Sequence, residues 1–298
     1  MPPDWITISM GDAAASVSPA QVCPRRPQPS AWKPIQADER TIMETIDAVQ
    51  ERFPQVEERM SAADRPPGVK LYELAFGNGM LASPFAWRVR LALAHKSIPF
   101  ESVPLGFTEI PTVLGPELKT VPVLEDRNGR RGESWEIVEY LEREYPQSPP
   151  LFAGSGEHAL ARFFDGWFSI EIMQRMFALY ALDIYNAARP VDRAYFRASR
   201  EARIGQTLEA FTAAREARLP ALRDALGPLR WHLKRRPFIA GEAPGYADFI
   251  ALGGFIWVGS VCTLPVLAKD DALGAWLDRS LNLYGGMARD ARLKPLQE

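Results

Sequence analysis

The sequence has few of the residues that build metal centres and disulfide frameworks. Its 298 residues include two cysteines, Cys23 and Cys262, and three histidines. The cysteines are far apart and form no CxxC pair, and the histidines form no HExxH motif. Neither a disulfide framework nor a protein-held metal site is therefore expected. This cysteine usage is typical of a reducing compartment, so a cytoplasmic location is predicted.

The sequence also lacks the motifs of nucleotide-binding and serine-nucleophile enzymes. There is no GxGxxG after a strand, no GxxxxGK[ST] and no GxSxG. The net charge is −2 and Lys and Arg form no long basic run, so neither a nucleic acid nor an anionic membrane is an expected partner. The uncharged run at 249–268 could span a bilayer, but three glycines and Pro265 interrupt it. A buried helix in a helical domain is expected there instead.

Three segments of different character follow one another. Residues 1–68 are rich in Pro, Ala, Ser and Gln, and only the spacing between Arg40 and Phe53 is helical. Residues 1–68 are therefore predicted to be a disordered extension, with one possible amphipathic helix between Arg40 and Phe53. Residues 69–152 alternate strand and helix patterns, whereas residues 153–298 show helical periodicity alone. The expected architecture is an α/β domain followed by an all-α domain.

The patterns of residues 69–152 predict a β-α-β opening and then a hairpin. A strand is expected at 69–74 and a helix at 84–95, with Ser83 as N-cap and Pro84 as its first residue. The first two strands should pair in parallel, and the turn DRNG should join an antiparallel pair. The other expected elements are a strand at 99–105, an irregular or short helical link at 107–116, strands at 121–126 and 129–133, and a helix at 135–145.

Two long apolar stripes at helical spacing mark the second domain. Pro220 and Pro228 should divide or bend the second stripe. The first stripe consists of Leu160, Phe163, Phe164, Trp167, Met173, Met176, Phe177 and Tyr180, and the second of Leu219, Leu222, Leu226, Leu229 and Leu233.

The order of these elements, with TVPVLED at 120–126 and GESWEIVEYLEREYP at 132–146, resembles the soluble glutathione transferases. The resemblance covers residues 69 to about 290 and implies a thioredoxin-like domain followed by an all-helical domain. It also implies glutathione as cosubstrate and a homodimer. PGYADFIAL at 244–252 is similar to the family's capped helix, with Gly245 at the N-cap and Asp248 able to reach back to it.

Three matching sites carry this resemblance. The family places a serine, tyrosine or cysteine beside the glutathione sulfur, and Ser83 occupies that position. Val121-Pro122 is similar to the family's cis-proline turn, where the valine backbone pairs with the cysteinyl backbone of glutathione. Glu133-Ser134 resembles the acidic residue and serine that hold the γ-glutamyl end. Taken singly, both serines could be ordinary helix caps and Pro122 could be an edge-strand proline.

Each of these residue types suits its implied partner. Ser134 is expected to be an N-cap that receives a carboxylate, while Glu133 meets an ammonium group. The hydroxyl group of Ser83 would donate to a thiolate at a helix N-terminus, where negative charge is favoured. Lys119 is a possible partner for the glycyl carboxylate, with a solvated lysine as the alternative.

The segments SPFAWRVRLALAHK and WLDRSLNLYGGM look like the bacterial glutathione transferases that cleave β-aryl ethers of lignin-derived compounds. This closer resemblance implies a hydrophobic aromatic second substrate. Conjugation of other electrophiles and a non-catalytic glutathione-binding module remain alternatives, whereas a reductase or isomerase would more naturally have cysteine at position 83. The candidate pocket walls are Phe76, Met80, Trp167, Met173, Phe177 and Tyr180, although the pattern of most of these aromatic residues is more typical of a core.

Overall fold

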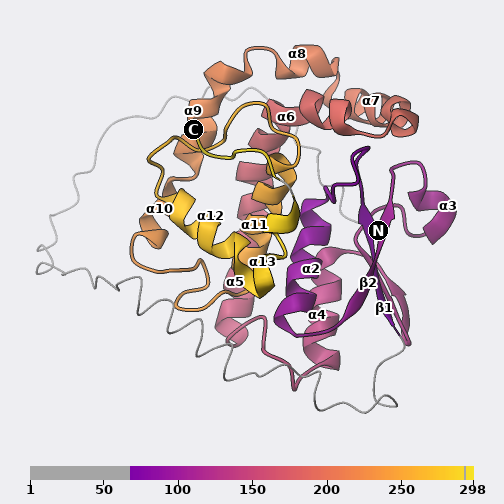
Figure 1. Cartoon of the computed structure of the whole chain (residues 1–298), viewed down its shortest axis with the longest axis vertical. Helices are drawn as coiled ribbons and strands as arrows, with labels where there is room; N and C mark the ends of the chain where they lie inside the picture. The colour runs from indigo at the N-terminus through magenta and orange to yellow at the C-terminus, as the bar shows by residue number, and fades with distance from the viewer. Residues whose placement is uncertain (1–67, 292) are drawn as a thin grey trace, which may run out of the picture. The chain divides into compact units, whose positions relative to one another are not determined.

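The described chain comprises residues 68–291 and 293–298 of a computed structural model (Figure 1). Its first part is built on a four-stranded mixed sheet. The strand order is β2-β1-β3-β4; β1 and β2 are parallel and the other two pairs antiparallel. The predicted parallel pair and the predicted hairpin are thus confirmed. The possible helix between Arg40 and Phe53 lies outside the described residues. The strands are β1 (Val69–Leu74), β2 (Phe100–Leu105), β3 (Val123–Asp126) and β4 (Gly129–Arg131).

Helices α2 (Pro84–His95) and α4 (Ser134–Glu144) pack against each other and against the sheet, and α3 (Ile110–Leu114) follows β2 (Figure 1). The bounds of α2 are those expected from the sequence, since Ser83 and Pro84 mark its beginning clearly. The helix that follows α4, α5, begins at Ser155. The predicted domain boundary at residue 152 therefore falls in the segment between α4 and α5.

Helices alone make up the second half of the described chain. As expected, the second apolar stripe is divided: α9 contains Pro220, and α10 begins with Pro228 in its first turn. The elements are α5 (Ser155–Trp167), the π-helix η2 (Phe168–Met173), α6 (Gln174–Ala187), α7 (Pro190–Ile204), α8 (Leu208–Thr212), α9 (Arg215–Ala225), α10 (Gly227–Leu233), α11 (Tyr246–Gly259), α12 (Leu273–Leu281), α13 (Leu283–Gly286) and the 3₁₀ turn η3 (Arg289–Ala291).

The first apolar stripe does not lie on one buried face. Leu160 and Phe163 on α5 are 70% and 73% exposed, whereas Met176 and Tyr180 on α6 are fully buried. The π-helix η2 lies between these two helices. Because a π turn has i→i+5 bonds, it rotates the chain relative to an α-helical repeat, so positions with one spacing in the sequence lie on different faces.

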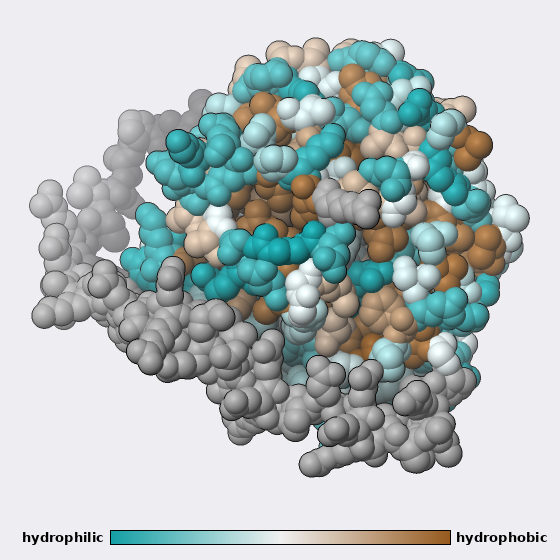
Figure 2. Space-filling view, viewed as in Figure 1, coloured by the Kyte–Doolittle hydropathy of each residue, from teal (hydrophilic) through white to brown (hydrophobic). Residues whose placement is uncertain are grey.

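Helix α11 is buried on almost all sides, which accounts for the absence of charged residues after Asp248 in its first turn. Each of its residues except Trp257 is buried. It packs closely on α2: a Cβ atom added to Gly253 would meet the carbonyl oxygen of Pro84 at 2.5 Å. Among residues 68–291 and 293–298, none of the helices combines the length and the hydropathy that a membrane span requires. Figure 2 shows hydrophobic patches among hydrophilic residues on one face of the molecule.

Candidate functional site

Ser83 lies at the carboxyl end of β1. The Ala82 N–H donates to the Leu74 carbonyl at 2.9 Å, which holds the start of α2 against the end of this strand. The Ser83 Oγ accepts a hydrogen bond from the Ala86 N–H at 3.2 Å, so the serine is the N-cap that the sequence predicts. Its own O–H has no acceptor among the described residues. The hydroxyl group can therefore cap the helix and donate to a ligand at the same time.

The Val121-Pro122 peptide bond is cis and lies at the same end of the sheet. The register pairs Tyr72 of β1 with Val123 of β3 in an antiparallel ladder, so the residues just before β3 are beside the carboxyl end of β1. Pro122 is buried and Val121 is partly exposed. The N–H and C=O of Val121 make no backbone hydrogen bond within residues 68–291 and 293–298. They form a short free edge to which a peptide can pair.

The Glu133-Ser134 pair follows β4 to this end of the sheet, because β4 is antiparallel to β3. The prediction that Ser134 is the N-cap is wrong: Glu133 occupies that position, with φ 60°, and Ser134 is the first residue of α4. Ser134 already has helical backbone geometry, so its N–H is one of the free groups of the first turn and its side chain does not cap the helix. Ser134 is buried at this helix start.

The Glu133 carboxylate has an unusual environment. It is exposed, and it has no hydrogen bond or ion pair in the part of the chain that the structure describes. Partial desolvation, followed by the negative charge of Glu136, raises the pKa of the Glu133 carboxyl group. Both effects disfavour the anion, so a cation bound beside Glu133 would relieve them. Lys119, also exposed, lies just before the cis-proline turn.

Two family models match the chain. The glutathione S-transferase N-terminal domain matches residues 78–149, and the glutathione S-transferase C-terminal domain matches residues 159–271. A glutathione transferase of Zea mays is 31% identical over 219 residues, which are 69% of this chain and 84% of that protein. The chain belongs to the glutathione S-transferase family.

Other glutathione transferases are similar to this chain in sequence or in fold. A probable glutathione S-transferase of Oryza sativa subsp. japonica is 28% identical over 217 residues, 67% of this chain and 81% of that protein. A glutathione S-transferase of Ceriporiopsis subvermispora, solved in complex with glutathione, is 22% identical with a TM-score of 0.61, over 76% of this chain and 96% of that one. A glutathione transferase from Phanerochaete chrysosporium is 25% identical with a TM-score of 0.59, over 75% and 95%. The predicted thioredoxin-like domain and helical domain are confirmed.

Three of the expected pocket walls of this glutathione transferase lie in its core. Phe76 is 2% exposed, Met173 is buried against Arg88, and Tyr180 is fully buried. Such side chains offer almost no surface to a second substrate, so their prediction as pocket walls is corrected. The apolar pattern could not separate the two roles, because core and pocket residues share one composition. The remaining candidates, Met80, Trp167 and Phe177, are partly exposed.

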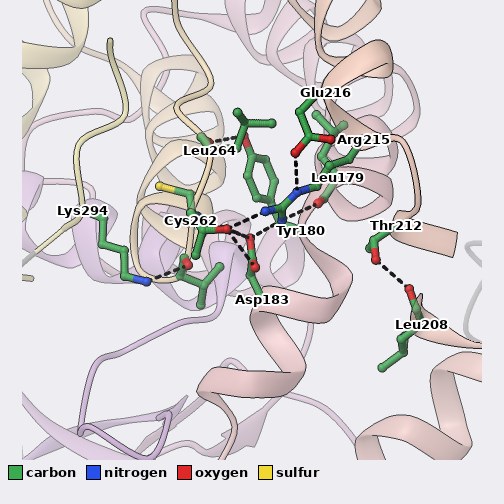
Figure 3. A network of polar contacts seen from close by, with 12 residues as sticks. Leu179, Tyr180, Asp183, Leu208, Thr212, Arg215, Glu216, Cys262, Leu264 and Lys294 are labelled. Atoms are coloured by element: carbon green, nitrogen blue, oxygen red, sulfur yellow. Dashed lines mark hydrogen bonds and ion pairs between the residues drawn. The ribbon is translucent and has the colours of Figure 1, made fainter. Parts of the chain in front are cut away.

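A polar network explains why Tyr180 is fixed in the core (Figure 3). Its hydroxyl group donates to the Leu264 carbonyl at 2.7 Å. One turn later, Asp183 binds Arg215 at 2.8 Å and accepts from the Thr263 hydroxyl. This network ties α6 and α9 to the segment after α11. Cys262 in the same segment is buried, and burial raises the pKa of its thiol to about 11, so it is not a reactive thiolate.

An ion pair that the sequence analysis missed joins α2, the helix that Ser83 caps, to α5 of the helical part of this glutathione transferase. Arg88 of α2 is fully buried, and its Nη1 contacts the Asp165 Oδ1 on α5 at 2.5 Å. Asp165 is also buried. The sequence does contain a signal for Arg88: this charged residue lies four positions from both Pro84 and Ala92, on the apolar side of the helix. Its partner could not be read from the sequence, because the two residues lie far apart in the chain.

Proposed function

We propose that this glutathione transferase binds glutathione across the sheet end formed by β1, β3 and β4. The observation that carries this proposal is the set of unused hydrogen-bonding groups at this end: the Ser83 O–H, the Val121 backbone and the Glu133 carboxylate. The Val121 N–H and C=O pair with the cysteinyl backbone. Glu133 meets the γ-glutamyl ammonium, and Ser134 at the start of α4 receives its carboxylate. Lys119, just before the cis-proline turn, is the proposed partner of the glycyl carboxylate.

Ser83 stabilises the thiolate of the bound glutathione. A thiol has a pKa of ~8.5, and lowering it by ~2 units requires about 2.7 kcal/mol of preferential stabilisation of the anion. The N-terminus of α2 contributes roughly 0.3 to 2 kcal/mol, and a hydrogen bond to a charged group roughly 1.5 to 3 kcal/mol. Together these are sufficient. No histidine base is required for this step.

We propose that the second substrate is a hydrophobic aromatic electrophile, as in the cleavage of a lignin-type β-aryl ether. The support is the sequence resemblance, with the partly exposed Met80, Trp167 and Phe177 as candidate contacts. The thiolate attacks the carbon next to a ketone, a C–S bond forms, and the C–O bond breaks. The electron pair leaves with the phenolate, which takes a proton from solvent. The products are a glutathione thioether and a free phenol.

The carbonyl group makes the attacked carbon electrophilic, so a pair of substrates tests this reaction. The purified protein and glutathione are incubated with a fluorogenic α-keto β-aryl ether and with its alcohol counterpart, which has almost the same size. Phenol release is expected from the ketone only. Reaction with a simple aryl halide and with neither ether would favour general conjugation. Glutathione binding without reaction of any electrophile would favour a non-catalytic module.

Binding of glutathione is tested separately from chemistry. Glu133→Ala and Ser134→Ala are expected to weaken binding, because each removes the partner of one charged group of the γ-glutamyl end. Isothermal titration calorimetry measures the affinity. Glu101→Ala, which removes an exposed carboxylate on β2, is a suitable control and should bind as the parent does. Unchanged affinity in both site variants would refute the γ-glutamyl assignment.

We propose in addition that the protein is a cytoplasmic homodimer. Leu160 and Phe163 of α5 and Ile170 of η2 are exposed large apolar residues, which a second copy could cover. Sedimentation of the full chain tests this. A dimer that Phe163→Glu converts to monomer is expected, while Val191→Glu, at an equally exposed apolar residue of α7, should leave the dimer intact. A monomer at all concentrations would contradict the proposal.

A further inference from the structure

Arg162 on α5 lies beside the start of α4. Its Cζ is 4.7 Å from the centroid of the Trp135 ring, and Trp135 directly follows Ser134. The Trp135 Nε1 donates to Glu139 at 2.7 Å, which fixes the ring that supports the guanidinium. The Arg162 side chain is 50% exposed. A stacked arginine with free donors is suited to binding a carboxylate in two contacts.

The positive charge of Arg162 is only loosely compensated. Its Nη1 is 3.4 Å from the Asp165 Oδ2, whereas the other carboxylate oxygen of Asp165 has a much shorter contact with the buried Arg88. Asp165 also accepts from the Ser169 hydroxyl at 3.4 Å. The Asp165 carboxylate thus contacts two guanidinium groups, and that of the buried Arg88 is closer to it than that of Arg162. The net charge of this cluster of two arginines and one aspartate is positive.

This cluster connects the two helix starts of the proposed glutathione site. Arg88 is in the second turn of α2, the helix that Ser83 caps, and Arg162 contacts the second residue of α4, the helix that Ser134 begins. Asp165 contacts both arginines. Arg162 is therefore the more exposed cation of a group that touches both helices. Glu133 is an exposed anion beside the same start of α4, with the exposed Glu136 in the first turn of that helix.

We propose that Arg162 binds the α-carboxylate of the γ-glutamyl residue while Glu133 binds its ammonium group. This inference rests on the proposed glutathione site and adds a specificity residue to it. An α-amino acid head group carries both charges on one carbon atom. A cation and an anion that both lie beside the α4 start would recognise it by charge as well as by shape. A peptide that lacks either charged group would be discriminated against by one of these two residues.

Two glutathione analogues separate the two contacts. γ-Aminobutyryl-cysteinylglycine lacks the α-carboxylate, and glutaryl-cysteinylglycine lacks the α-amine. The affinities of the parent protein, Arg162→Gln and Glu133→Gln for glutathione and for both analogues are measured by calorimetry. Arg175→Gln, which removes an exposed arginine paired with Glu171 on the neighbouring helical segment, is the matched control. Arg162→Lys tests whether charge alone is sufficient. Circular dichroism and melting verify that each variant is folded.

Arg162→Gln is expected to bind glutathione roughly ten- to a hundredfold more weakly, as for a lost hydrogen bond to a charged group, but the analogue without carboxylate as well as the parent does. Glu133→Gln should show the reverse selectivity, and Arg162→Lys an intermediate loss. Equal losses of Arg162→Gln for glutathione and the decarboxylated analogue, or no loss, would overturn the assignment of Arg162 alone. Failure of the parent to bind glutathione would overturn the proposed function itself.

Discussion

At the scale of single residues, Ser83 has two hydrogen-bonding capacities and the fold uses only one. Its Oγ accepts from the Ala86 N–H, and its O–H remains available at the end of β1. Thr207 has the same capping bond, at the same 3.2 Å, at the start of α8. The two caps therefore differ in location and not in local geometry.

This difference makes a prediction for Ser83→Ala. Turnover should fall roughly ten- to a hundredfold, equivalent to about 1.4 to 2.7 kcal/mol, and the pH–rate profile should move to higher pH because the thiolate is less stabilised. Glutathione affinity should be largely kept. Ser83→Ala and Thr207→Ala should each lose about 1 kcal/mol of stability, because each removes one helix cap. Thr207→Ala should show no kinetic change. An identical pH–rate profile in Ser83→Ala and the parent would reduce Ser83 to a cap.

The sequence was sufficient for some residues of the site and insufficient for others. The Ser83 cap followed from the local pattern of serine, proline and apolar residues, and the resemblance supplied the cis bond at Val121-Pro122, which the structure confirms. The predicted N-cap, Ser134, is one position away from the observed N-cap, Glu133. The backbone conformation of Glu133 decides which residue is the cap, and the sequence does not show it. The partnership of Arg88 with Asp165 depends on tertiary packing, which no local pattern contains.

At the scale of secondary-structure elements, two helix features show where periodicity succeeds and where it fails. Helix α2 has the bounds that the sequence predicts. The spacing from Leu160 to Tyr180 predicts one apolar stripe, but η2 interrupts the α-helical repeat between α5 and α6, and Leu160 and Phe163 are exposed. A π segment has no distinctive composition in this sequence, so spacing alone could not detect it.

The close packing of α11 on α2 makes a prediction about two helical glycines. A Cβ atom at Gly253 would meet the Pro84 carbonyl oxygen, whereas at Gly156 of α5 it would meet nothing within 4 Å. Gly253→Ala should destabilise the protein by about 1 to 3 kcal/mol through overpacking, despite the better helix propensity of alanine. Gly156→Ala should be neutral or stabilising by up to about 1 kcal/mol. Urea unfolding measures both, and equal stabilities would contradict the close contact.

At the scale of the whole molecule, contacts distant in sequence hold the thioredoxin-like and helical parts together. The Gly77 N–H donates to the Ala187 carbonyl at 3.0 Å, and both the N–H and the hydroxyl of Thr108 donate to Asp192 at 2.8 Å. The first of these contacts anchors the loop that leads to Ser83. The position of Ser83, the proposed thiolate-stabilising residue, thus depends on the helical part as well as on its own strand.

His95 makes a further link, and it predicts a pH dependence. Its Nδ1 is 2.8 Å from the Tyr284 hydroxyl and its Nε2 is 3.0 Å from the Pro150 carbonyl. Burial lowers the pKa of His95, with the charge of Lys96 acting in the same direction. Because the unfolded chain then binds this proton more readily, the contribution to stability is present above the unfolded pKa of ~6.5 and is lost as pH falls below it.

The test compares the parent with His95→Gln, which keeps a polar side chain but does not titrate. Urea unfolding is measured between neutral and mildly acidic pH, and the difference in unfolding free energy between the two proteins is plotted. The parent should lose more stability than the variant as pH falls below ~6.5. Parallel stability curves would show that His95 is not held neutral by the fold.

We propose that this glutathione transferase lowers the pKa of the glutathione thiol through the Ser83 hydroxyl group. The most direct measurement is an ultraviolet titration of the thiolate in the complex of the full chain with glutathione, for the parent and for Ser83→Ala. In the parent, the bound thiol should titrate about 2 units below its free value of ~8.5, and in Ser83→Ala it should return much of the way to that value. A bound thiol that titrates like free glutathione in the parent would contradict the account.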